Sequence, residues 1–122
     1  MITVKHFFAS RFIRFSYGRT DHKRDALQRT PADITRYDNI LYGNDQRLKK
    51  WQLLDVYRPK SALEADGSLK KLPVIISVHG GSFVYGDKEK YQFYCMNLAQ
   101  RGFAVINFSY RLAPEAKYPS SV

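Results

Sequence analysis

The feature that most constrains the fold is a pair of short apolar runs on either side of an amphipathic segment. Residues 73–78 and 103–108 are rich in β-branched and aromatic side chains without polar alternation, which is typical of strands buried on both faces. Residues 88–101 between them have a helical apolar face, with Asp87 as a candidate N-cap and Gly102 at the C′ position. This order predicts a βαβ unit with parallel strands, and therefore an α/β fold.

The residues before this unit predict an antiparallel edge pair. Residues 37–42 and 50–57 are strand candidates, separated by the turn-forming residues 43–45. Pro59 ends the second strand, because proline cannot donate to a sheet ladder. Residues 36–122 are therefore expected to form one partial α/β domain.

Residues 1–35 differ from the rest and are predicted to be a basic, helical N-terminal segment. No acidic residue precedes Asp21, and Phe8, Phe12 and Phe15 share one face of a helix. Three interpretations are open: a helix packed on the domain, a membrane-surface helix, and an arginine-rich organelle presequence. Packing of the phenylalanine face on the domain is the interpretation that we favour, because apolar helix stripes usually face a core.

Composition excludes several classes. The formal charge of +9 and the aromatic-interleaved arginines of residues 11–19 invite a nucleic-acid interpretation, but no zinc-ligand spacing or helix-turn-helix pattern accompanies them. We expect a solvated basic face and no nucleic acid. No apolar run approaches the ~18 residues of a membrane span, so no integral membrane contact is expected. The lone Cys95 and the interrupted apolar N-terminus favour a cytoplasmic protein.

The loop of residues 79–87 is the segment most suited to chemistry. It follows the carboxyl end of a buried strand, where ligands bind in open α/β sheets. Adjacent glycines let backbone N–H groups converge on one point. The glycine spacings of phosphate-binding loops are absent. The loop therefore favours an oxyanion hole, in which fixed donors stabilise developing negative charge. Neither a cofactor nor a metal site is expected.

Three motifs carry a resemblance to a known family. Residues 54–59 (LDVYRP), 78–83 (VHGGSF) and 110–115 (YRLAPE) resemble, in order, landmarks of α/β-hydrolase esterases and lipases, close to the hormone-sensitive-lipase-like branch. The resemblance covers residues 36–122. It implies a carboxylic-ester hydrolase of the serine-hydrolase type, acting on a small-molecule ester.

The same resemblance assigns roles in the loop. It makes the N–H groups of Gly81 and Ser82, with Gly80 as a further candidate, the oxyanion-hole donors, and His79 a residue that orders the loop. Many relatives have a third glycine where this chain has Ser82. Phe83 and Tyr85 are substrate-pocket candidates, although Tyr85 could equally pack in the interior.

Other polar residues are expected to be structural. Ser109 is interpreted as a strand-end residue, Cys95 as a core residue and Asp87 as a helix cap. By resemblance, Arg111 and Glu115 brace the loop after the last strand. Ser82 fails the G-x-S-x-G pattern of a nucleophile elbow and follows the wrong strand.

The family's Ser, Asp or Glu, and His triad follows the oxyanion loop, and the sequence holds no match to it. The fold is therefore interpreted as truncated before the nucleophile elbow, and the 122 residues alone are expected to be inactive. Truncation would leave strand 73–78 as an open apolar edge, which predicts self-association. The alternative function is a non-catalytic ligand-binding or interaction protein on a remnant of the fold.

Overall fold

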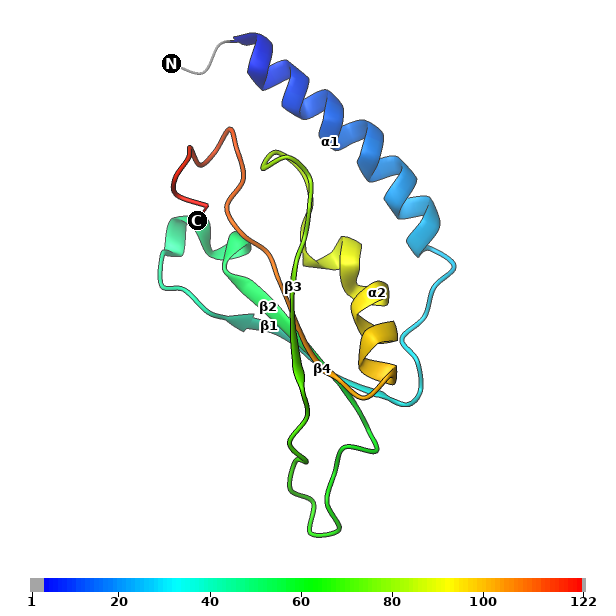
Figure 1. Ribbon diagram of the computed structural model, residues 1–122. Helices are drawn as coiled ribbons and strands as arrows, with labels where there is room; N and C mark the ends of the chain where they lie inside the picture. The colour runs from blue at the N-terminus through cyan, green and yellow to red at the C-terminus, as the bar shows by residue number, and fades with distance from the viewer. Residues whose placement is uncertain (1–3, 122) are drawn as a thin grey trace.

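A computed structural model describes residues 4–121 of the protein (Figure 1). Two helices, one 3-10 helix and four strands follow one another along the chain. They are α1 (Val4–Asp25), β1 (Ile34–Leu41), η1 (Gln46–Trp51), β2 (Leu53–Pro59), β3 (Val74–Val78), α2 (Lys88–Gln100) and β4 (Ala104–Phe108).

The four strands form one mixed sheet in the order β1-β2-β4-β3. β1 pairs antiparallel with β2, and β2 pairs antiparallel with β4. β3 pairs parallel with β4 in a continuous register from Val74 opposite Ala104 to Val78 opposite Phe108. The predicted antiparallel pair and the predicted parallel βαβ unit are thus confirmed, and the fold is α/β.

Helix α2 covers one face of this sheet, and the core lies between the two (Figure 1). Asp87 caps the helix by accepting the N–H of Lys90 at 3.1 Å. Gly102 follows the helix with a φ of 96°, the left-handed conformation that the C′ position requires. Cys95 and Met96 are fully buried against the sheet, so the prediction of Cys95 as a core residue is confirmed.

The boundaries of the edge pair differ from the predicted ones. Lys50 and Trp51 belong to η1, and β2 begins only at Leu53. The reason is local, because the carboxylate of Asp45 accepts the N–H of Arg47 and starts a 3-10 turn. β1 begins earlier than predicted, at Ile34, whose partner across the ladder is Pro59.

Residues 73–78 have the composition of a strand buried on both faces, but within residues 4–121 one face of β3 is open, as the expected open edge implies. Val74, Ile76 and Val78 are 59%, 63% and 65% exposed. β3 is one of the two edge strands of the sheet, and α2 lies on the opposite face. Within residues 4–121, no second layer covers the face that these three side chains occupy (Figure 1).

The predicted packing of the phenylalanine face of α1 is also wrong. Phe8, Phe12 and Phe15 are exposed, while Ser10 on the opposite side of the helix is buried. α1 lies along the loop between β3 and α2 rather than on the sheet (Figure 1). Neither described helix combines the length and the hydropathy needed to cross a membrane.

A buried ion pair fastens the start of α2 to the sheet. Lys88 Nζ lies 2.9 Å from Oδ1 of Asp55, and the two side chains are 4% and 2% exposed. The Asp55 carboxylate also accepts the hydroxyl of Tyr57 at 2.9 Å and the N–H of Asn39 at 2.8 Å. Burial alone would lower the pKa of Lys88, but hydrogen bonds from its ammonium to Glu89 and Asp55 raise it.

Candidate oxyanion-hole site

The loop after β3 forms a tight turn at the carboxyl end of the strand. The carbonyl of Gly81 accepts the N–H groups of both Val84 and Tyr85 at 3.0 Å. Gly81, Ser82 and Phe83 have consecutive positive φ angles of 126°, 53° and 59°. The left-handed region costs a non-glycine residue roughly 1–2 kcal/mol. Ser82 therefore occupies a conformation that the third glycine of many relatives would adopt without strain.

Two glycines of the loop are required by close contacts. A Cβ on Gly81 would lie 1.9 Å from the carbonyl oxygen of Tyr85. A Cβ on Gly86 would lie 2.4 Å from Nδ1 of His79. Only residues without a side chain allow the loop to close so tightly on itself.

The N–H groups of the predicted oxyanion-hole residues have no partner within the part of the chain that the structure describes. No backbone hydrogen bond there has the N–H of Gly80, Gly81 or Ser82 as its donor. The same three residues line an open cavity of about 910 Å³. An oxyanion hole requires N–H donors that are free and lie beside a cavity. The assignment of Gly80, Gly81 and Ser82 to an oxyanion hole stays a prediction.

His79 lies beneath this loop and is 2% exposed. Its ring stacks on Tyr110 with the centroids 4.2 Å apart, and Nδ1 lies 2.8 Å from the carbonyl oxygen of Gly80. Because a carbonyl only accepts, Nδ1 carries the proton. Burial lowers the pKa of His79. The neutral ring thus holds the backbone at Gly80, and these contacts fit the predicted loop-ordering role.

The two predicted pocket residues lie in different places. Tyr85 lines the cavity, and its hydroxyl donates to the carboxylate of Asp21 on α1. The Tyr85 ring also lies against Tyr17 of α1, with the centroids 5.7 Å apart. Phe83 is 56% exposed, packs edge-on against Tyr110, and is not among the residues that line the cavity.

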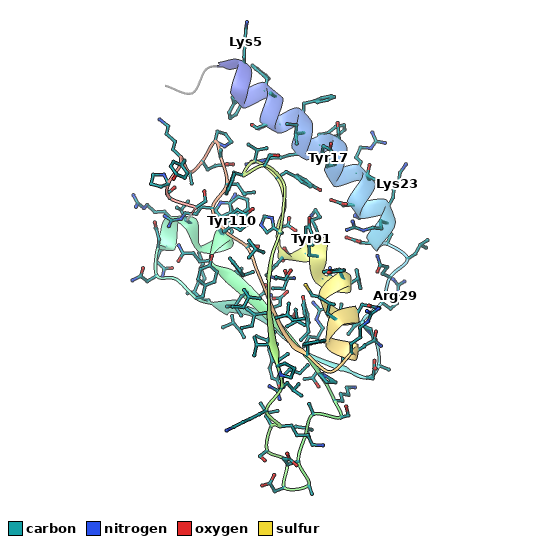
Figure 2. The ribbon with its side chains drawn as sticks, in the orientation of Figure 1. Lys5, Tyr17, Lys23, Arg29, Tyr91 and Tyr110 are labelled. Atoms are coloured by element: carbon teal, nitrogen blue, oxygen red, sulfur yellow. The ribbon has the colours of Figure 1, made fainter. Side chains whose placement is uncertain are left out.

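Both helices supply walls of the cavity, a role of α1 that the sequence did not indicate. The lining combines aromatic and charged side chains: α1 and the residues after it contribute Ile13, Tyr17, Asp21, Arg24, Asp25 and Gln28, and α2 contributes Lys90, Tyr91, Phe93, Tyr94 and Asn97. Tyr17 and Tyr91 point toward this region in Figure 2.

Arg14 clamps α1 to two loops and was not recognised from the sequence. Its Nε donates to the carbonyl of Val84 at 2.8 Å, and Nη2 donates to the carbonyl of Ala113 at 2.7 Å. Its guanidinium also binds both carboxylate oxygens of Glu115 at 2.8 Å. Glu115 thus braces the loop after β4 through α1, a contact that no local sequence pattern signals.

Ser109 has the contacts of a structural residue. Its side chain accepts the N–H of Lys88 at 3.1 Å, and its own N–H donates to the carbonyl of Leu53 at 3.0 Å. It is 2% exposed and lies directly after β4. These contacts agree with its interpretation as a strand-end residue.

The Arg14–Glu115 pair predicts a pH dependence of stability. The hydrogen bonds from Arg14 lower the pKa of Glu115 to about 2 from its usual 4.5. A carboxyl group whose pKa is lowered by folding stabilises the fold at any pH above the pKa that it has in the unfolded chain. This stability is lost as the pH falls from about 4.5 to 2. Since the Glu115 side chain is 38% exposed, we expect a loss of under ~1 kcal/mol.

The measurement is urea unfolding between pH 2 and 6 for the natural chain and Glu115→Gln. The glutamine variant should lack this component of the pH dependence. Glu64→Gln, at an exposed position outside any ion pair of the described residues, is the control. Equal pH dependence in all three proteins would contradict the prediction.

The fold and the loop together define the class of this protein: it has an α/β-hydrolase fold, of which these residues form the N-terminal part. More narrowly, the chain belongs to the BD-FAE family, whose model matches residues 54–122.

Curated relatives agree with this placement. The chain is 34% identical to esterase LipC of Mycobacterium tuberculosis over 68% of its own length and 19% of the relative's. It is 33% identical to probable carboxylesterase 16 of Arabidopsis thaliana over 88% of its own length and 22% of the relative's. Among solved structures, an esterase B from Lactobacillus rhamnosis inhibited by a tributyrin phosphonate is similar, with a TM-score of 0.77 and 28% identity. That match covers 98% of this chain and 37% of the other. The chain thus spans about a fifth of these curated relatives and about a third of the solved chain.

Proposed function

We propose that residues 79–86 form the oxyanion hole of a carboxylic-ester hydrolase of the serine type. The observation that carries the proposal is a set of three N–H groups, those of Gly80, Gly81 and Ser82, which have no partner within residues 4–121 and lie beside the cavity at the carboxyl end of β3. Membership of the family and the esterase relatives support the same chemistry.

In such a reaction a serine hydroxyl attacks the acyl carbon, and the carbonyl oxygen gains a negative charge. The N–H groups of Gly81 and Ser82 donate hydrogen bonds to that oxygen. One such donor typically contributes about 3–4 kcal/mol to the transition state. The tetrahedral intermediate collapses to an acyl-enzyme by expelling the alcohol, and water then releases the acid. Tyr85 and Tyr17 would contact the substrate from the side of α1.

We assign the nucleophile, the acid and the base to none of these 122 residues. The sequence contains no G-x-S-x-G motif, and the two serines nearest the loop are poorly suited to attack. Ser109 is buried and hydrogen-bonded to the backbone of α2. Ser82 is itself one of the proposed donors. The 122 residues alone are therefore proposed not to turn over esters.

The first test is an assay of the 122-residue chain with p-nitrophenyl butyrate. We expect hydrolysis no faster than with serum albumin at equal mass. Saturable turnover that a serine-directed phosphonate abolishes would overturn the proposal that the triad lies outside these residues. Ser82→Ala and Ser109→Ala would then identify the nucleophile.

The second test supplies a catalytic triad from a related esterase. In a chimera, residues 1–122 replace the matching part of the Lactobacillus rhamnosis esterase B, to which 98% of this chain is matched. We expect the folded chimera to hydrolyse p-nitrophenyl butyrate. A folded chimera that binds this ester without hydrolysing it would contradict the esterase proposal and favour a ligand-binding protein.

A further inference from the structure

The face of α1 turned away from the rest of the chain carries a stripe of cationic and aromatic side chains. Its members recur every three or four residues, so they lie along one side of the helix. This set, called the outer stripe, consists of Lys5, Phe8, Phe12, Phe15, Arg19 and Lys23, with Arg11 beside it. All of its members are exposed, Phe8, Phe12 and Phe15 by 64%, 71% and 62%. Figure 2 shows Lys5 and Lys23 projecting from the helix away from the sheet.

The opposite face of α1 is already occupied, which fixes the direction of the stripe. Arg14 binds the carbonyls of Val84 and Ala113, and Asp21 accepts the hydroxyl of Tyr85. The helix therefore cannot turn its phenylalanines inward without breaking these contacts. Within residues 4–121, the stripe is exposed because the inner face of α1 makes these contacts.

The charge of the stripe is of one sign. The first acidic residue of the chain is Asp21, and it lies on the inner face against Tyr85. The guanidinium of Arg19 lies over the ring of Phe15, 5.5 Å from its centroid, so cation and aromatic ring form one continuous surface. A shallow hollow of about 510 Å³ adjoins the stripe. Its lining is mostly basic: Arg14, Phe15, Gly18, Arg19, His22 and Lys23.

We propose that the outer stripe docks α1 on an anionic lipid surface, with the phenylalanines at the acyl boundary and the cations at headgroup phosphates. Helices in a membrane interface place Lys and Arg at the headgroups and Phe or Leu at the acyl boundary, and in α1 both kinds of side chain share the outer face. Each cation near an anionic surface contributes about fivefold to binding. The basic hollow adjoining Phe15 offers a place for a phosphate group.

Two other partner classes fit the stripe less well. Protein interfaces are enriched in Phe and Arg but depleted in lysine, and the three cations of the stripe together with Arg11 would need an unusually acidic partner. Nucleic-acid phosphates would pair with the cations, but they would leave three large apolar rings at the centre of the stripe in water. An anionic lipid surface satisfies both kinds of side chain.

Docking would orient the rest of the molecule. The loop of residues 79–86 is bound to the inner face of α1 and would therefore lie about one helix diameter, ~10 Å, above the lipid. The inference goes beyond the proposed function, because lipid binding needs no ester turnover.

The test is sedimentation of the 122-residue chain with vesicles of phosphatidylcholine, with and without phosphatidylglycerol. We expect binding to the anionic vesicles only, and its reversal by salt. Arg11→Gln with Arg19→Gln should weaken binding about 25-fold, from about fivefold for each charge. Phe8→Ala with Phe12→Ala should also weaken it by at least tenfold, because each ring removes apolar area from water.

Matched controls lie outside the stripe. Lys70→Gln with Lys71→Gln removes the same charge from an exposed connection, and Tyr118→Ala removes an 84% exposed aromatic ring. Neither should change binding by more than about twofold, and circular dichroism checks that every variant is folded.

Several results would overturn the proposal. These are no binding to anionic vesicles at low salt, equal binding to neutral vesicles, and equal losses in stripe and control variants. Tighter binding to an oligonucleotide than to vesicles would assign the stripe to nucleic acid. Stripe-dependent dimerisation without lipid would assign it to a second copy of the chain. None of these outcomes depends on esterase activity.

Discussion

Replacing Gly81 by alanine is expected to lower the kcat of the esterase chimera by about 10²-fold or more, with little change in KM. The new Cβ would lie 1.9 Å from the carbonyl oxygen of Tyr85, so the turn must open to accept it. Opening moves the N–H groups of Gly81 and Ser82 by about 1 Å, a displacement that can cost 10²-fold in rate. Because the oxyanion exists only in the transition state, the loss appears in kcat.

A second glycine provides a matched control. Gly67 also has a positive φ, 83°, but a Cβ there would meet nothing within 4 Å, and it lies in the turn between β2 and β3. Gly67→Ala therefore imposes comparable backbone strain without disturbing the loop. An equal kcat in the natural and Gly81→Ala chimeras would contradict the oxyanion assignment. An equal loss of kcat in the Gly81→Ala and Gly67→Ala chimeras would mean that the effect comes from reduced stability.

The elements that could be predicted from the sequence are those with a local signal. Parallel pairing of β3 and β4 follows from two continuous apolar runs with a helix between them. The cap at Asp87 and the turn at Gly102 are encoded within a few residues of where they act. The βαβ unit, and with it the position of the glycine loop, can therefore be predicted from the sequence.

The contacts of α1 could not be predicted, because they join residues far apart in the chain. Arg14 lies 70 residues from Val84 and 101 from Glu115. The spacing of Phe8, Phe12 and Phe15 indicates an apolar face but not what covers it. Residues on the other side of the helix, polar by sequence, make the contacts instead.

What covers the second face of β3 could not be predicted for a related reason. A run such as residues 73–78 indicates a strand suited to burial on both sides, but the second layer must come from elsewhere. β3 is an edge strand, and Ile76 on its open face is 63% exposed. Self-association through this edge stays a prediction. Its basis is that an unpaired apolar strand is a template for pairing with another chain.

Replacing Asp55 by asparagine is expected to destabilise the chain by about 3–5 kcal/mol, the usual cost of leaving a buried charge without its partner. The Nζ of Lys88 would lose a carboxylate at 2.9 Å and keep only Glu89, whose side chain is 54% exposed. Total stabilities of about 5–15 kcal/mol make this loss a large fraction of the whole. Urea unfolding followed by circular dichroism measures it.

A double substitution separates burial of charge from loss of packing. Asp55→Asn with Lys88→Met removes both charges, and replacing a whole buried pair by uncharged groups is often close to neutral. We therefore expect the double variant to regain most of the stability that the single one loses. Asp38→Asn is the surface control: its pair with Arg36 is 38% and 28% exposed and should contribute under ~1 kcal/mol. Asp55→Asn could instead lower the free energy of unfolding no more than Asp38→Asn does. Water would then reach the Asp55–Lys88 pair, and only the cap and the apolar face of α2 would hold the start of the helix.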